Sequence, residues 1–164
     1  MPKWIEFALT CVGQKEVAGP ASNGWIKSLW QSLKGGAWFW TQYGSDDSKL
    51  PWCGAWVAYC LNEVGIAYPP VYASALSWAS FGEACGPAVG AIAVLTRNGG
   101  GHVAFVTGMS TDGRFIRLLG GNQGDAVNES WFTTDRVTAY RKPPGEELGI
   151  TQYASVGSMS TSQA

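Results

Sequence analysis

The chain has very little histidine, few charged residues and no long hydrophobic run, and each shortage excludes a class of protein. His102 is the single histidine among 164 residues, so a zinc site built from two or three imidazoles is excluded. Charged residues make up only 14% of the chain, and 11 Lys and Arg against 12 Asp and Glu give a net charge of -1. That balance argues against broad binding to nucleic acid, which needs a basic face. No run approaches the ~18 apolar residues of a membrane span, so we expect no stable membrane insertion.

Cysteine is sparse as well, and the chain has no paired-cysteine motif. None of its four cysteines forms a C-x-x-C pair, so we expect neither a zinc knuckle nor a thioredoxin-like site. Near the N-terminus Trp4, Phe7, Ala8 and Cys11 follow helical spacing, and Glu6 interrupts the apolar stretch. This pattern predicts a packed first helix and not a signal peptide. We therefore expect a protein that is made in the cytoplasm and delivered if it acts outside it.

Hydrophobic residues, by contrast, make up 46% of the chain, and nine of them are tryptophans. This apolar content is enough to build one hydrophobic core. The length predicts a single domain, and we place it at residues 1–142. Residues 143–164 are rich in Ser, Gly, Thr and Gln. We expect this tail to follow the surface or to fray, with a docking peptide as the alternative.

The first half of the chain has the periodicity of helices. A helix capped by Ser22 or Asn23 is expected to run to a Gly-Gly stop, followed by a loop over residues 37–50. Pro51 then opens the strongest predicted helix, with Cys53 in its first turn. Its apolar stripe is Cys53, Trp56, Val57, Cys60, Leu61 and Val64, and Gly65 ends it. A shorter helix is expected at 74–81.

The second half has the composition of strands separated by glycine-containing turns. The predicted strands are Gly90–Thr96, His102–Met109, Arg114–Gly120 and Arg136–Arg141. Helices that precede an antiparallel sheet are typical of the α+β class.

The hairpin around Asp112 and Gly113 has two possible registers. A two-residue loop places Gln123 on the face of His102, whereas a three-residue loop with a left-handed Gly113 places Asn122 there. A slip of one residue inverts a whole face, and burial of the apolar positions favours the three-residue loop. Asn122 is then predicted to lie directly across from His102.

These residues together predict a nucleophile, a base and an orienting group. Free N–H groups in the first turn of a helix favour the thiolate of Cys53. An imidazole within reach, His102, would take the thiol proton, and the side-chain oxygen of Asn122 would accept the second ring N–H. The backbone N–H of Cys53 is one oxyanion donor, and a second is expected from the loop at Gln42 and Tyr43.

Three ordered motifs resemble a known group of enzymes. The stretches DDSKLPWCGAWVAYCLNEVG, GHVAFVTG and LLGGNQG look like the NlpC/P60 and CHAP peptidoglycan hydrolases, and are closest to their small phage-associated branch. The resemblance covers about residues 13–141. It implies a papain-like fold, with N-terminal helices packed on a C-terminal antiparallel sheet, and a Cys53–His102–Asn122 triad. Many NlpC/P60 members have a histidine at the third position, and here the chain is similar to the CHAP variant. It lacks the D-x-D-G calcium loop of some CHAP lysins, so neither a metal nor a cofactor is expected.

The resemblance implies cleavage of an amide bond in bacterial peptidoglycan, by an N-acetylmuramoyl-L-alanine amidase or a peptide endopeptidase. A phage endolysin or virion-associated lysin, with delivery by a holin or the virion, is the expected setting, and an injected effector would look similar. Two alternatives stay open: a catalytically idle wall-binding or virion module of the same fold, and an acyltransferase.

Further residues are candidates for oxyanion stabilisation or substrate binding because they lie near the motifs. They are Gln42, Tyr43, Asp47, Trp52 and Gln123. A carboxylate such as that of Asp47 would suit a substrate amine, although capping or a turn is its simpler role. Trp38, Trp40, Trp52 and Trp131 are expected either to line a groove or to pack at the edge of the core.

Overall fold

The computed structural model describes residues 1–18, 23–43, 50–97 and 100–156. Helices and 3-10 helices come first along the chain: α1 (Lys3–Leu9), α2 (Gly24–Gln31), α3 (Gly36–Tyr43), α4 (Cys53–Glu63) and η2 (Ala75–Ser80). The sheet follows: β1 (Glu83–Ala84), β2 (Ile92–Arg97), β3 (Gly100–Ser110), β4 (Phe115–Gln123), β5 (Ala126–Thr133), η3 (Thr134–Arg136), β6 (Val137–Lys142) and β7 (Tyr153–Ala154). The predicted α+β class is confirmed.

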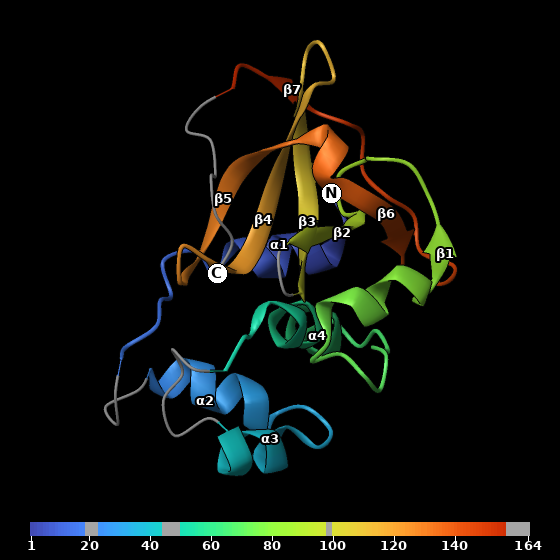
Figure 1. Ribbon diagram of the computed structural model, residues 1–164. Helices are drawn as coiled ribbons and strands as arrows, with labels where there is room; N and C mark the ends of the chain where they lie inside the picture. The colour runs from blue at the N-terminus through green and yellow to red at the C-terminus, as the bar shows by residue number, and fades with distance from the viewer. Residues whose placement is uncertain (19–22, 44–49, 98–99, 157–164) are drawn as a thin grey trace.

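The strands form one sheet in the order β1-β6-β2-β3-β4-β5, with antiparallel neighbours and β7 added parallel to β3. Figure 1 shows α4 between this sheet and the pair α2 and α3. The position of α4 follows from its sequence, because nearly every residue of the helix is apolar and buried. No helix in the described part of the chain is long and apolar enough to cross a membrane.

Most of the predicted helices are present, but the loop expected at 37–50 is wrong in its first half. Asn23 caps α2 through its side-chain oxygen, which accepts from two backbone N–H groups, and α4 begins at Cys53. The residues after Gly35 form α3 because their aromatic side chains pack on α2, with the rings of Trp30 and Phe39 5.6 Å apart. This tertiary contact is not visible in local periodicity. The helix expected at 74–81 is the 3-10 helix η2.

All four predicted strands are present, and β5 was missed. Its centre is polar, with Asn128, Glu129 and Ser130 in succession, so it lacks a continuous β-rich run. It lies at the edge of the sheet and pairs only with β4 among the named strands, where such residues are tolerated.

The β3–β4 hairpin combines the two registers that the sequence allowed. Val106 pairs with Leu118, as predicted for a three-residue loop. Nearer the turn, Met109 pairs with Ile116, which is the register of a two-residue loop, and a bulge after Val106 absorbs the difference. The predicted loop length is therefore wrong, although the predicted register holds in the middle of the hairpin. Gly113 has the expected left-handed conformation, with φ of 74°.

The sheet buries both faces in separate clusters, because alternate residues of a strand point to opposite sides. On one face α4 packs against β3, with the rings of Trp56 and Phe105 5.5 Å apart. The second cluster includes Ala104, Val106 and Phe132 and lies on the other face. This arrangement leaves the start of β3 and the end of β4 beside the N-terminus of α4.

Residues 143–156 follow the surface of the sheet. Gly149 N–H donates to Val89, and β7 continues beside Met109 of β3. Leu148 packs against both apolar clusters. The domain boundary at residue 142 stays a prediction.

Candidate active site

Cys53 is the first residue of α4 and is 4% exposed. The preceding residue, Trp52, has a non-helical backbone conformation (φ -121°, ψ 10°), and the chain enters the helix directly after it. First-turn N–H groups of a helix have no intrahelical acceptor, so those of α4 surround the sulfur with positive potential. The sequence prediction that Cys53 lies in a first helical turn is confirmed.

A cavity of about 220 Å³ opens beside Cys53. Its walls come from three segments: the start of α4, the approach to η2, and the start of β3. The lining residues are Pro51, Cys53, Ala73, Ser74, Ala75, Leu76, Gly100 and Gly101. Gly101 lies close to η2, since a Cβ at this position would be 2.5 Å from the exposed side chain of Leu76. Gly101, the residue before His102, therefore lines the same cavity as Cys53.

His102 is fully buried near the start of β3, and its ring stacks on Phe132 with the centroids 6.0 Å apart. Its Nε2 atom lies 3.0 Å from the Oε1 atom of Gln123. Its ladder partner is Leu95 of β2. A ring held on one face and at one nitrogen has a fixed orientation.

The hydrogen bonds of Gln123 identify which nitrogen of His102 carries a proton. The Gln123 amide nitrogen donates to the backbone oxygens of Leu118 (3.2 Å) and Asn128 (2.8 Å), which can only accept. The amide oxygen of Gln123 must therefore face His102, and Nε2 must donate to it. In the neutral imidazole the remaining nitrogen, Nδ1, is then the basic one.

Asn122 does not take the orienting position that the sequence predicted for it. Its side-chain oxygen is buried and has no hydrogen-bond partner among the described residues, and the β3–β4 pairs end at Phe105 and Leu119. The physical reason is an irregularity in β4: its register with β5 shifts between Gly120 and Gln123, and Asn122 is left-handed with φ of 60°. Strict alternation is lost there, and Gln123 moves onto the His102 face.

Trp52 supports the site from inside and does not offer a surface to substrate, in contrast to the prediction. It is fully buried, and its indole N–H donates to Glu16 Oε2 at 2.9 Å. Gly121 of β4 lies directly against it, since a Cβ there would be 2.9 Å from the Trp52 ring. Trp52 thus joins the N-terminal segment, the end of β4 and the turn that carries Cys53.

The remaining candidates are placed differently. Gln42 is exposed in the last turn of α3, whereas the side chain of Tyr43 and the whole of Asp47 lie outside the described residues. Of the tryptophans considered for a groove, Trp40 and Trp131 are buried, and Trp38 is 56% exposed. Edge packing is therefore the correct interpretation for Trp40 and Trp131.

Sequence reasoning missed the supporting roles of Glu16 and Phe132. The first lies in the stretch KEVAG, but neither residue has a spacing that relates it to Cys53 or His102. Among the described residues no group of three or more His, Cys, Asp or Glu side chains lies close enough to hold a metal ion.

Residues 43–122 match the family model of the CHAP domain. This part of the chain, just under half of its length, is therefore similar to the CHAP domain. The match spans both Cys53 and His102, and the α+β arrangement is consistent with the papain-like fold of this family. CHAP domains are typically cysteine- and histidine-dependent amidohydrolases or endopeptidases that act on peptidoglycan. Comparisons with curated proteins and with solved structures gave no significant match.

Proposed function

We propose that this protein is a cysteine peptidase or amidase that cuts an amide bond of bacterial peptidoglycan. The observation that carries the proposal is the fixed imidazole: Gln123 holds Nε2 of His102, and the residue before this histidine, Gly101, lines the same cavity as Cys53. A buried histidine with one nitrogen anchored to an amide oxygen is arranged to exchange a proton through the other nitrogen.

The reaction follows from these groups. Nδ1 of His102 takes the thiol proton as Cys53 Sγ forms a bond to the amide carbonyl carbon. The resulting oxyanion accepts a hydrogen bond from the backbone N–H of Cys53. The imidazolium then protonates the amide nitrogen, the C–N bond breaks, and the amine leaves a thioester on the sulfur. A water molecule gives a proton to His102 and attacks the thioester, which releases the acid and regenerates the thiol.

Gln123 is the orienting member of the triad in this proposal, in place of Asn122. Its oxygen accepts a hydrogen bond from Nε2–H and stabilises the imidazolium, while its amide nitrogen donates to two carbonyl oxygens. Asn122 contributes through the left-handed backbone that brings Gln123 into position.

The central test uses purified cell wall and the Cys53→Ala variant. We expect no release of soluble muropeptides by this variant, with an unchanged melting temperature, and full activity from a Cys85→Ala control. Mass spectrometry of the wild-type products distinguishes a muramoyl-alanine amidase from a peptide endopeptidase. Wild-type activity in the Cys53→Ala variant would exclude the proposal.

An idle wall-binding or virion module is the second candidate, because Cys53 is almost fully buried within an apolar cluster. The rate of alkylation by iodoacetamide distinguishes the hydrolase from the idle module. In an active hydrolase, Cys53 should react faster than free cysteine at pH 7. Acyl transfer uses the same residues, and an added amine that becomes incorporated into the product would identify it.

We propose a bacteriophage lysin as the setting, supported by the resemblance of the GHVAFVTG and LLGGNQG motifs to the phage-associated branch. In this setting the enzyme reaches the wall through a holin or on the virion. Expression in a bacterial host should cause lysis when a holin is co-expressed and none without it. Lysis that does not depend on a holin would count against this route.

A further inference from the structure

A second cavity, of about 540 Å³, lies at the opposite end of α4 from Cys53. It is lined chiefly by Lys34, Asn62, Ile66, Tyr68, Pro70 and Tyr72. It is larger than the cavity of about 220 Å³ beside the nucleophile, and none of the triad residues lines it. The reaction described above leaves it unused.

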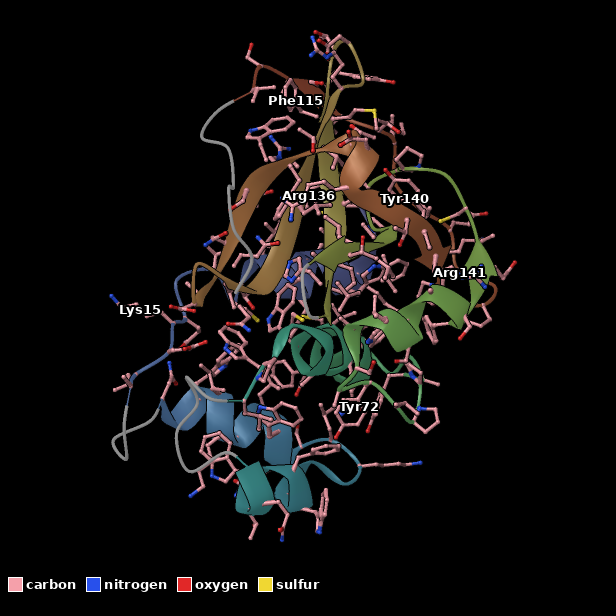
Figure 2. The ribbon with its side chains drawn as sticks, in the orientation of Figure 1. Lys15, Tyr72, Phe115, Arg136, Tyr140 and Arg141 are labelled. Atoms are coloured by element: carbon pink, nitrogen blue, oxygen red, sulfur yellow. The ribbon has the colours of Figure 1, made fainter. Side chains whose placement is uncertain are left out.

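The half-buried Tyr68 gives this cavity an aromatic wall, and Tyr72, which is only 1% exposed, supports that wall from inside. Tyr68 OH accepts a hydrogen bond from the backbone N–H of Lys34 at 3.0 Å, and Tyr72 OH donates to the carbonyl oxygen of the same residue at 2.8 Å. The two rings meet edge to face with centroids 5.5 Å apart. Figure 2 shows Tyr72 between α4 and the helical pair below it. Burial raises the pKa of Tyr72 to about 12, so its hydroxyl stays neutral and keeps donating.

The polar groups of the cavity lie at its rim. Lys34 and Asn62 are both exposed, and they supply an ammonium and a carboxamide next to the apolar wall of Tyr68 and Pro70. A pyranose ring has the complementary surface: apolar C–H faces that pack on aromatic rings, and hydroxyl and acetamido groups at its edges.

The cavity is connected to the catalytic one by a single loop. Tyr68, Pro70 and Tyr72 line the larger cavity, and the next residues, beginning with Ala73, line the cavity beside Cys53. The residues Cys53 and Asn62 are nine positions apart on α4, which corresponds to about 14 Å at 1.5 Å per residue. A wall polymer, in which sugars carry peptide stems, has sugar rings within that distance of an amide bond held at Cys53.

We propose that the Tyr68–Tyr72 cavity binds the N-acetylated glycan of peptidoglycan while an amide bond of the same strand occupies the cavity at Cys53. This inference rests on the proposed function for its choice of polymer. The glycan subsite holds substrate and leaves the chemical step unchanged, so it affects binding of sugar-containing substrates alone.

The experiment measures binding of a chitin tetrasaccharide, an oligomer of N-acetylglucosamine, to the Cys53→Ala protein by NMR titration. We expect shifts at residues around the cavity. Lys34→Ala and Asn62→Ala should each weaken binding about 3- to 10-fold, as expected for the loss of one hydrogen bond. Ala67→Arg, which fills the cavity from an exposed position, should abolish it. Glu63→Ala, exposed in the same helical turn as Asn62 and outside the lining, is the matched control and should bind normally.

The same substitutions in the active protein should raise KM for intact wall and leave kcat on a sugar-free stem peptide unchanged. If the protein cuts cell wall but does not bind the tetrasaccharide, or binds it equally with Ala67→Arg, the glycan subsite is wrong and the proposed function stands. If the tetrasaccharide binds in the expected way and no bond is cut, the subsite is correct and the hydrolase proposal fails.

Discussion

Gln123 shows how a single side chain can fix the protonation of its neighbour. Its amide nitrogen is held by the backbone oxygens of Leu118 and Asn128, so its oxygen has one orientation, and the Nε2 proton of His102 is set by it. The position also depends on Gly120, where a Cβ would collide with the Gln123 side chain. The orienting function is therefore a property of the whole Gly-Gly-Asn-Gln segment at the end of β4.

The Gln123→Leu variant tests this role. Loss of the acceptor leaves the ring free to rotate and to change tautomer, and we expect kcat to fall on the order of 10²-fold. The acid limb of the pH profile of kcat/KM should also shift, which a purely structural defect would not cause. Asn122→Gly is the matched control, because glycine accepts a φ of 60° and the side-chain oxygen of Asn122 has no hydrogen-bond partner among the described residues. Equal losses in both variants would contradict the assignment to Gln123.

The Cys85 thiol gives a prediction with a pH dependence. Burial raises the pKa of this half-buried thiol, and the nearby Lys142 and Arg141 lower it by less. A raised pKa means that the reactive thiolate forms only at higher pH. In the Cys53→Ala protein, the rate of Cys85 alkylation should therefore keep rising above the pH at which free cysteine levels off. We expect mass spectrometry to show little modification of Cys85 at pH 7, and rapid modification there would contradict the effect of burial.

At the scale of elements, α4 connects the two cavities through close packing at its first turn. Gly54 lies against the carbonyl of Tyr72, and a Cβ at that position would collide with it. The carbonyl of Tyr72 also accepts the indole N–H of Trp78 at 3.1 Å. The loop over 67–76 is thus held against α4 at the residue next to the nucleophile.

Gly54→Ala should displace that loop. Because the collision is with backbone, we expect a destabilisation of about 2 kcal/mol together with reduced activity. Gly24→Ala is the control, since α2 leaves open space at this position and alanine is the better helix former, with an expected gain of up to about 1 kcal/mol. Urea unfolding measures both, and an unchanged stability of Gly54→Ala would show that the loop moves freely.

At the scale of the whole molecule, residues 143–156 pack against the sheet. Leu148 contacts both apolar clusters, and Gly149 and Gln152 form backbone hydrogen bonds with Val89 and Met109. The segment therefore contacts both apolar clusters, and its strand β7 pairs in parallel with the end of β3.

Two substitutions in this segment should differ in their effect. Leu148→Ala removes a half-buried side chain, and we expect the free energy of unfolding to fall by about 1–2 kcal/mol. Ile150→Ala, at a side chain that is 88% exposed, should change it by less than about 0.5 kcal/mol. Thermal or urea unfolding provides the comparison. Equal effects would mean that the segment does not contribute to the core.

The α+β class, the helix that begins at Cys53 and the strand that carries His102 can all be predicted from the sequence. Helical and strand periodicity, the position of proline and the left-handed glycines are local signals, and they were sufficient for these elements. The CHAP motifs were equally visible, because they consist of contiguous residues around Cys53 and His102.

Local sequence patterns could not predict three features: the hydrogen bond between His102 and Gln123, the helical conformation of α3 and the burial of Trp52. Each depends on contacts between segments far apart in the chain: the irregular register of β4 with β5, the packing of aromatic residues on α2, and the hydrogen bond from Trp52 to Glu16. A shift of one residue in a strand changes the face of every side chain beyond it, and its cause lies in the neighbouring strand, where local sequence patterns give no information.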